Sequence, residues 1–256
     1  MAAPRMPEHV EARREGEVCI LTLRREEKLN ALSTALEREL LRALAGEEVS
    51  ESRCVVITGG GRAFSAGADV TELSRDDPAG ILAYYRETGD LYERIAALPQ
   101  PTIAAVHGYC LGGGLELALA TDFRVAEETS AFGLPEVELG ILPSSGGTYR
   151  LVRLLGPARA KELMLLRARF SAGEALGWGL VSEVVPEGKA LERALELAER
   201  LASLPPLAAS VAKQAADLMP ESSREAGILI ERLAYGLLAQ TDTAHRARED
   251  FEGRSR

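Results

Sequence analysis

Short apolar runs that alternate with longer periodic segments constrain the fold of this chain more than any other feature. Runs with β-branched residues and Gly or Pro boundaries predict strands at residues 18–23, 53–58, 101–106, 123–126 and 181–185. Helical stretches are predicted between them, at residues 33–44, 79–97, 113–120 and 158–166. This alternation predicts an α/β fold with parallel strand pairing.

The pattern changes after about residue 185, where only helical segments follow, at residues 190–203, 206–218 and 221–251. Apolar residues in the first of these segments recur at helical spacing. We therefore predict an α/β core at residues 1–190 and a helical region at residues 191–256. Such a tail either covers the core or builds a subunit interface, and the pattern alone leaves both open.

Charge and hydropathy exclude several classes of protein. The chain of 256 residues has a net charge of −9, whereas proteins that bind nucleic acid usually present a basic surface. The first residues contain no apolar core of a signal peptide, and no apolar run approaches the roughly 20 residues that span a bilayer. We expect a cytoplasmic protein with neither a nucleic-acid nor a membrane partner.

The cysteines and histidines predict no metal site. Cys19, Cys54 and Cys110 are not spaced as metal ligands, and two of them fall in strand-like runs, as buried free thiols do. The three histidines are scattered and form no ligand pattern. His107 follows a strand-like run and is interpreted as a structural turn residue.

The stretch LGGGLELALATD, at residues 111–122, places three glycines before a helical segment that carries one carboxylate, Glu116. Glycines at a helix start allow close approach of the backbone and leave the first N–H groups unpaired. Those N–H groups, at the positive end of the helix dipole, suit a negative or developing negative oxygen. For a glycine run alone, tight packing of the helix against a strand explains the sequence equally well.

Two further glycine-rich segments have no single explanation. The segment TGGGRAFSAGAD, at residues 58–69, fits neither GxGxxG nor a P-loop. A flexible turn explains it as well as a functional role does. The segment at residues 131–151 holds Glu136 and Glu138, and we expect Glu138 to be solvated. Ser144 and Ser145 lack the nucleophile-elbow pattern, so one of them is expected to cap the helix that follows.

Together, five ordered segments resemble the enoyl-CoA hydratase/isomerase (crotonase) family. The resemblance extends from about residue 18 to residue 185 and continues more loosely through the helical tail. The segments that carry it are LTLRREEKLNALS (21–33), VVITGGGRAFSAGAD (55–69), PTIAAVHGYCLGGGLELALATDFRVA (101–126), FGLPEVELGILPSSGGTYRL (132–151) and SAGEALGWGLVSEVV (171–185).

The resemblance implies a crotonase-like spiral of repeated ββα units with a C-terminal helical region that forms trimers or hexamers. It also implies an acyl-CoA thioester substrate, with no cofactor beyond the coenzyme A of the substrate itself. In the family, two backbone N–H groups form an oxyanion hole, and they match Ala68 and Gly113. Two catalytic glutamates match Glu116 and Glu136.

The resemblance also implies a set of residues that bind coenzyme A. The backbone at Lys28 and Leu29 and the segment from Ala66 through Asp69 to Val70 would line the pantetheine and adenine. Arg25 and Lys28 would face phosphates, although ordinary surface charge explains these two equally well. Many family members have Arg-Pro where this chain has Arg25-Glu26, and the usual basic tail is poorly reproduced at residues 243–256.

The paired glutamates favour one activity, the reversible addition of water across the 2,3 double bond of a 2-enoyl-CoA. We expect Glu136 to exchange the proton at Cα and Glu116 to position and activate water. Double-bond isomerisation, or another lyase or isomerase reaction of this fold, is the alternative because Glu136 alone can shuttle a proton between carbons. A non-catalytic family member that binds coenzyme A or RNA is disfavoured by the acidic charge and the intact glutamate pair.

Overall fold

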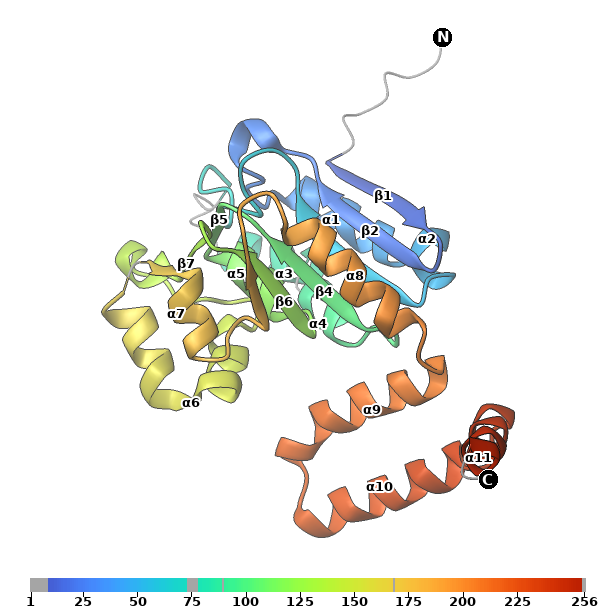
Figure 1. The fold of residues 1–256 in the computed structure, drawn as a ribbon. Helices are drawn as coiled ribbons and strands as arrows, with labels where there is room; N and C mark the ends of the chain where they lie inside the picture. Colours follow the sequence, from blue (N-terminus) through green and yellow to red (C-terminus); the bar gives the residue numbers. More distant parts are fainter. Residues whose placement is uncertain (1–8, 73–77, 89, 168, 255–256) are drawn as a thin grey trace.

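The computed structural model describes residues 9–72, 78–88, 90–167 and 169–254. Its core is a six-stranded sheet in the order β1-β2-β3-β4-β6-β9, in which all neighbouring strands are parallel except β1 and β2 (Figure 1). The strands are β1 (Val10–Glu15), β2 (Val18–Leu23), β3 (Cys54–Gly59), β4 (Thr102–Val106), β6 (Phe123–Glu127) and β9 (Glu183–Val185). All five predicted strands are therefore present, and the prediction missed the edge strand β1 and the three short strands of a second sheet.

A smaller sheet in the order β5-β7-β8 lies beside the large one. Its strands are β5 (Tyr109–Leu111), β7 (Ala131–Gly133) and β8 (Phe170–Ser171). Successive passes of the chain place one strand in the large sheet and the next in the small one before a helix follows, as β4, β5 and α5 (Gly113–Leu119) do. This arrangement is the predicted spiral of ββα units.

Both faces of the large sheet are buried, because alternate residues of each strand belong to two different apolar clusters. Helix α8 (Ala190–Ala202) covers one face, and its buried residues are small, which lets its backbone lie close to the strands (Figure 1). These residues are Ala190, Ala194, Ala198 and Ala202. This helix begins at residue 190, the predicted boundary between the α/β core and the helical region, yet it packs on the core sheet.

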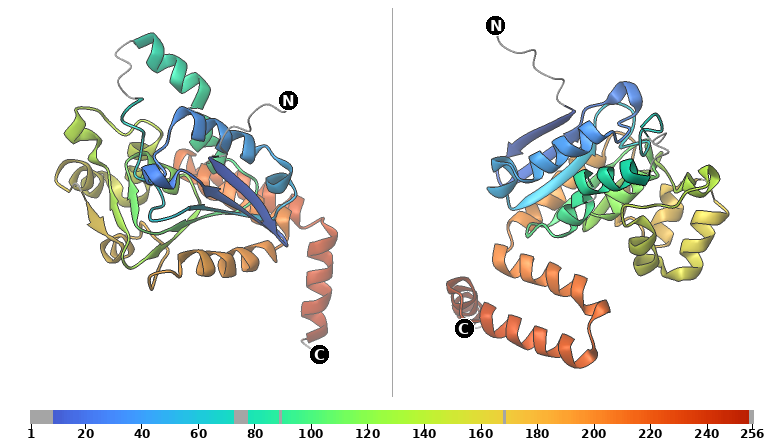
Figure 2. Two further views of the ribbon diagram at one scale, coloured as in Figure 1. Left: turned by 90° about the horizontal axis from the view of Figure 1, so that it is seen from above. Right: turned by 180° about the vertical axis from the view of Figure 1, so that it is seen from behind.

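The opposite face of the large sheet packs against α1 (Thr34–Leu44), α4 (Asp90–Ala96) and α5, as the view from behind shows (Figure 2). The N-cap of α1 is Ser33, whose side chain accepts a hydrogen bond from the Leu36 N–H. The predicted helix at 79–97 is divided into α3 (Pro78–Thr88) and α4.

Helix α6 (Gly147–Leu165) begins eleven residues before the helix predicted at residue 158. Gly156 has φ of 76° and ψ of 162°, so it separates two helical segments, and Pro157 begins the second of them. The Gly-Pro pair therefore marks a kink within a longer helical element. Helix α7 (Ala172–Gly177) follows, and a reciprocal capping box between Ser171 and Glu174 fixes its start.

Three helices extend from the core as an arm: α9 (Pro206–Leu218), α10 (Arg224–Leu238) and α11 (Asp242–Arg254). Figure 1 shows α9 and α10 side by side and antiparallel, with α11 at the end of the arm. The predicted helix at 221–251 is therefore divided, because the chain turns between residues 239 and 241.

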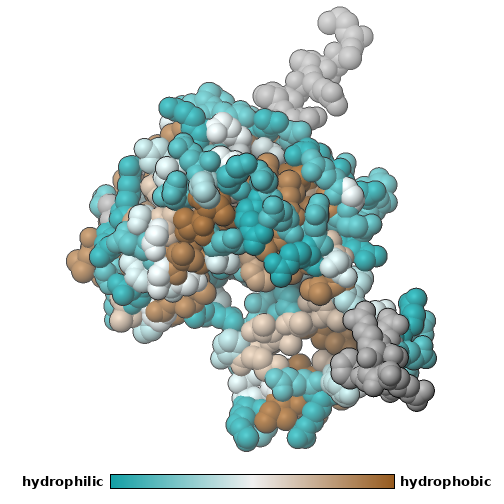
Figure 3. All heavy atoms as spheres, in the orientation of Figure 1, coloured by the Kyte–Doolittle hydropathy of each residue, from teal (hydrophilic) through white to brown (hydrophobic). Residues whose placement is uncertain are grey.

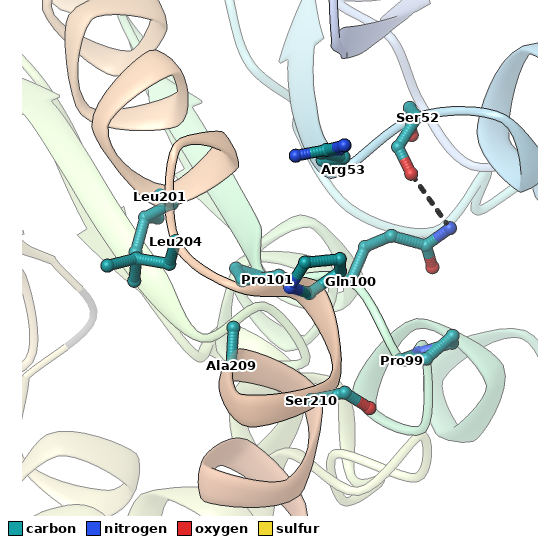
Figure 4. Close-up of a pocket in the computed structure, with 10 residues that line it drawn as sticks. Ser52, Arg53, Pro99, Gln100, Pro101, Leu201, Leu204, Ala209 and Ser210 are labelled. Carbon is teal, nitrogen blue, oxygen red and sulfur yellow. Dashed lines mark hydrogen bonds between the residues drawn. The ribbon is translucent and has the colours of Figure 1, made fainter. Parts of the chain in front are cut away.

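The junction of α8 and α9 lies against the segment that leads into β4. Leu201 and Leu204 surround this point together with Pro101 (Figure 4). The Lys213 ammonium donates to the Gln100 carbonyl at 3.1 Å and lies 2.9 Å from the Asp122 carboxylate. These contacts fix the base of the arm to the core.

A groove separates the core from α9 and opens on the surface that Figure 3 shows. Both charged and apolar side chains line its walls. They include Arg124, Tyr149, Arg153, Lys213, Asp217 and Glu221. Among the described residues, no helix is both long enough and apolar enough to cross a membrane.

Candidate active site

Helix α5 begins at the glycine run, where the backbones of three segments meet. Gly112 has φ of 50° as the residue before the helix, and its N–H donates to the Gly133 carbonyl at 2.9 Å. A Cβ atom on Gly114 would lie 2.6 Å from the Ser65 carbonyl oxygen, so no larger residue fits there without a backbone shift. The run therefore brings the first N–H of the helix, that of Gly113, against the loop that follows β3.

Ala68 presents a second N–H beside that of Gly113. The bridge between Leu32 and Ala68 uses the N–H groups of Leu32 and Asp69, which leaves the Ala68 N–H directed to the other side. A Cβ atom on Gly113 would lie 3.5 Å from the Ala68 nitrogen. Within the described residues, neither of these two N–H groups donates to a protein acceptor. They form a pair of donors suited to one anionic oxygen.

Glu116 lies one turn into α5 and is 3% exposed. Its Oε1 accepts hydrogen bonds from the N–H groups of Ser145 and Gly147, both at 2.8 Å. A Cβ atom on Gly147 would lie 2.6 Å from the Glu116 Cγ, so this residue must be small for the carboxylate to reach the loop. The carboxylate is therefore buried and fixed by a polar loop, and it is not directed to solvent.

Glu136 lies in the short 3₁₀ helix η2 (Pro135–Leu139) and is 9% exposed. Its Oε1 lies 3.0 Å from the point that a Cβ atom on Gly112 would occupy, and Gly67 borders the same point. Its Oε2 is buried and has no hydrogen-bond partner among the described residues. The carboxyl group is therefore next to the glycine run, and one of its oxygens is available to a ligand.

Burial raises the pKa of both carboxyl groups. For Glu136 the pKa rises to about 7, mainly through desolvation and also through the nearby charge of Glu116. Desolvation likewise raises the pKa of Glu116, while the N–H groups of Gly147 and Ser145 and the charge of Arg150 oppose the rise. The charge of Glu116 acts on Glu136, so the two groups form an interacting pair beside the two N–H donors.

Arg25 and Asp69, both predicted to bind coenzyme A, are paired with one another at 2.7 Å. The Arg25 guanidinium also donates to the Ala31 carbonyl at 3.0 Å. The Thr71 side chain and Arg25 lower the pKa of Asp69 to about 2. Both side chains are therefore engaged within the protein and fix the loop that carries Ala68.

The other residues predicted to bind coenzyme A lie at one edge of the site. The Ala66 N–H donates to the Leu29 carbonyl at 2.9 Å, which joins the two predicted segments. Lys28 is exposed next to Leu29, and Val70 is 63% exposed beyond the Ala68 loop. Lys28 is thus a cation on this edge that is free to face solvent, whereas Arg25 is held in an ion pair.

The residues of the site that sequence reasoning missed lie in two places. The first is the 145–147 loop that binds Glu116, where the predicted serine cap of α6 is wrong, since Gly146 precedes the helix without a side-chain cap. In the sequence, only the pair Gly146-Gly147 at the start of this helix pointed to the loop. The second is Tyr92, whose hydroxyl donates to buried Glu37 at 3.0 Å and borders Gly113. No short motif connects these positions.

Comparison with known proteins gives the family of the chain. A model of the enoyl-CoA hydratase/isomerase family matches residues 13–255. The 2,3-dehydroadipyl-CoA hydratase of Escherichia coli (strain K12) is 43% identical over an alignment of 251 positions, and the match covers 94% of this chain and 97% of that protein. The short-chain-enoyl-CoA hydratase of Clostridium acetobutylicum is 36% identical and covers 90% of this chain and 88% of its own length.

A solved structure extends the agreement to the fold. The crystal structure of an enoyl-CoA hydratase from Bacillus anthracis matches with a TM-score of 0.90 at 38% identity, over 96% of each chain. The match includes the C-terminal arm, because so little of either chain is left out. The protein therefore belongs to the enoyl-CoA hydratase/isomerase family.

Proposed function

We propose that the protein is an enoyl-CoA hydratase, which adds water reversibly across the 2,3 double bond of a 2-enoyl-CoA thioester. The observation that carries the proposal is the arrangement of two buried carboxyl groups beside two backbone N–H groups that have no acceptor among the described residues. Relatives that align over most of the chain and are named hydratases support it.

The N–H groups of Ala68 and Gly113 are proposed to hold the thioester carbonyl oxygen. This oxygen gains negative charge as the nucleophile adds to Cβ, so fixed donors favour the transition state over the ground state. Each such donor lowers the activation barrier by roughly 3 kcal/mol. Gly113 is also the first residue of α5, so the helix dipole acts in the same direction.

The two carboxyl groups divide the proton transfers. Glu116, fixed at Oε1 by the 145–147 loop, accepts a proton from water as the water oxygen bonds to Cβ. Glu136, whose pKa of about 7 keeps a protonated fraction at neutral pH, donates a proton to Cα. The next water then returns the proton from Glu116 to Glu136, which balances the cycle.

Coenzyme A is proposed to bind along the edge formed by Lys28, Leu29, Ala66 and Val70. The neighbouring backbone segments suit pantetheine, and the Lys28 ammonium suits a phosphate. Arg25 and Asp69 act there by fixing the loop through their ion pair. No step of the reaction requires a cofactor beyond the coenzyme A of the substrate.

The test is loss of the ultraviolet absorbance of the conjugated enoyl thioester after the enzyme is mixed with crotonyl-CoA. A series of longer 2-enoyl-CoA thioesters and 2,3-dehydroadipyl-CoA, the substrate in the name of the Escherichia coli relative, would define the acyl preference. We expect 3-hydroxyacyl-CoA as the product. A product with a shifted double bond would instead support an isomerase, and no product from any thioester would contradict an enzymatic role.

We propose that the arm joins copies of the chain into a trimer or hexamer. Helix α10 has exposed apolar side chains that a single chain leaves uncovered, including Leu229, Leu233, Tyr235 and Leu237. Light scattering after size exclusion should give a mass of three or six chains of 27.5 kDa. A monomer at micromolar concentration would contradict this assembly.

We infer a cytoplasmic location from the cysteines. Cys19, Cys54 and Cys110 are buried free thiols, as is common in a reducing compartment.

A further inference from the structure

Arg150 lies in the first turn of α6 with a side chain that is only 12% exposed. Its Nη1 donates to the Ser145 carbonyl at 3.0 Å. Its Nη2 lies 3.4 Å from the Tyr92 carbonyl and 2.6 Å from the Glu93 carboxylate, both on α4. The guanidinium therefore ties the start of α6 to α4 across the 145–147 loop.

The same loop binds Glu116 from its other side. Ser145 accepts from Arg150 through its carbonyl and donates to Glu116 through its N–H. Gly146, between the two donors, has φ of 90°, and a Cβ atom there would lie 2.1 Å from the Arg150 Nη1. The loop conformation that directs both N–H groups at Glu116 thus depends on the fit of this guanidinium.

We propose that Arg150 is a positioning residue for Glu116, which it holds through the 145–147 loop. The inference rests on the proposed function, in which Glu116 activates water. Among the described residues, Arg150 acts on Glu116 through Ser145 and through its charge without touching it, so it takes no part in the proton transfers. It also connects the water-activating carboxylate to α4, whose Tyr92 borders Gly113.

The charge of Arg150 gives the proposal a signature in the pH profile. The ionisable groups that act with Glu116 are Arg150 from α6, Glu136 from η2 and Tyr92 from α4, and Glu93 partly neutralises Arg150. Arg150 lowers the pKa of Glu116, so removal of its charge raises that pKa further. Because water activation needs ionised Glu116, the acidic limb of the kcat/KM profile must move to higher pH.

The experiment compares Arg150→Met and Arg150→Lys with Arg153→Met in the full-length protein. Arg153 lies on the same helix but bonds to Tyr149 and Glu221 at the groove, so its replacement controls for loss of a partly buried arginine. We expect Arg150→Met to lower kcat by about 10- to 100-fold and to move the acidic limb upward. Arg150→Lys should restore the position of the limb, and Arg153→Met should change neither quantity.

Two outcomes would overturn the proposal. One is an Arg150→Met enzyme with normal kcat, and the other is a lower kcat with an acidic limb that does not move, which indicates a merely structural role. A Glu116→Gln variant shows whether the acidic limb comes from Glu116, because the residual activity of this variant should lack that limb. The absence of hydration by the wild-type enzyme would contradict the proposed function itself and is thereby distinguishable.

Discussion

Replacement of Glu136 by glutamine is expected to lower kcat for hydration by about 10²- to 10⁴-fold, the usual contribution of a positioned general acid. The amide has the shape of the carboxyl group but cannot release a proton to Cα. The buried Oε2 of Glu136 has no partner among the described residues, so the substitution breaks no hydrogen bond at that atom. Stopped-flow or steady-state measurement with crotonyl-CoA tests the loss.

The role of Glu136 as the acid also predicts the direction in which the wild-type rate changes with pH. Hydration uses the protonated form of Glu136, so its rate should fall as pH rises through about 7. Dehydration of 3-hydroxyacyl-CoA needs the same single proton on the glutamate pair, now on Glu116, and the overall reaction releases no net proton. Its kcat/KM should therefore fall over the same pH range as that of hydration. Glu138→Gln is the matched control, because Glu138 lies in the same short helix and is exposed. Full hydration by Glu136→Gln would refute the assignment of the acid.

Replacement of Gly67 by alanine should both destabilise the protein and impair catalysis. Gly67 has φ of 100°, and a Cβ atom there would lie 2.8 Å from the Leu111 carbonyl oxygen on the segment that leads to Gly113. Relief of this contact must move Ala68 or Gly113, whose N–H groups form the donor pair. We expect kcat/KM to fall by about 10²- to 10³-fold, as when one donor of an oxyanion hole is lost.

Gly16→Ala separates the two effects of that substitution. Gly16 has φ of 58° in the turn between β1 and β2, and a Cβ atom there would have no neighbour within 4 Å. Its replacement should cost about 1–2 kcal/mol of stability, from backbone strain alone, and leave kcat/KM unchanged. Equal activity of Gly67→Ala and the wild-type enzyme, together with a lower melting temperature, would show that the donor pair does not depend on Gly67.

Most of the fold could be predicted from the sequence because strands and helices leave their patterns in short stretches of residues. Short β-branched runs predicted every long parallel strand, and the helical spacing of alanines and leucines predicted α8. The edge strand β1 was missed because its residues are charged and mostly not buried. The start of α6 was missed because Gly156 and Pro157 read as a boundary, whereas the chain continues through them as a kink.

The sequence by itself determined the chemical groups of this protein: the glycine run, two glutamates twenty residues apart, and five segments that identify the family. Only the tertiary structure decided how these groups act together. Burial beside a second carboxylate raises the pKa of Glu136, and a loop from α6 holds Glu116. Desolvation and hydrogen bonding depend on segments that are distant along the chain, so no local pattern specifies them.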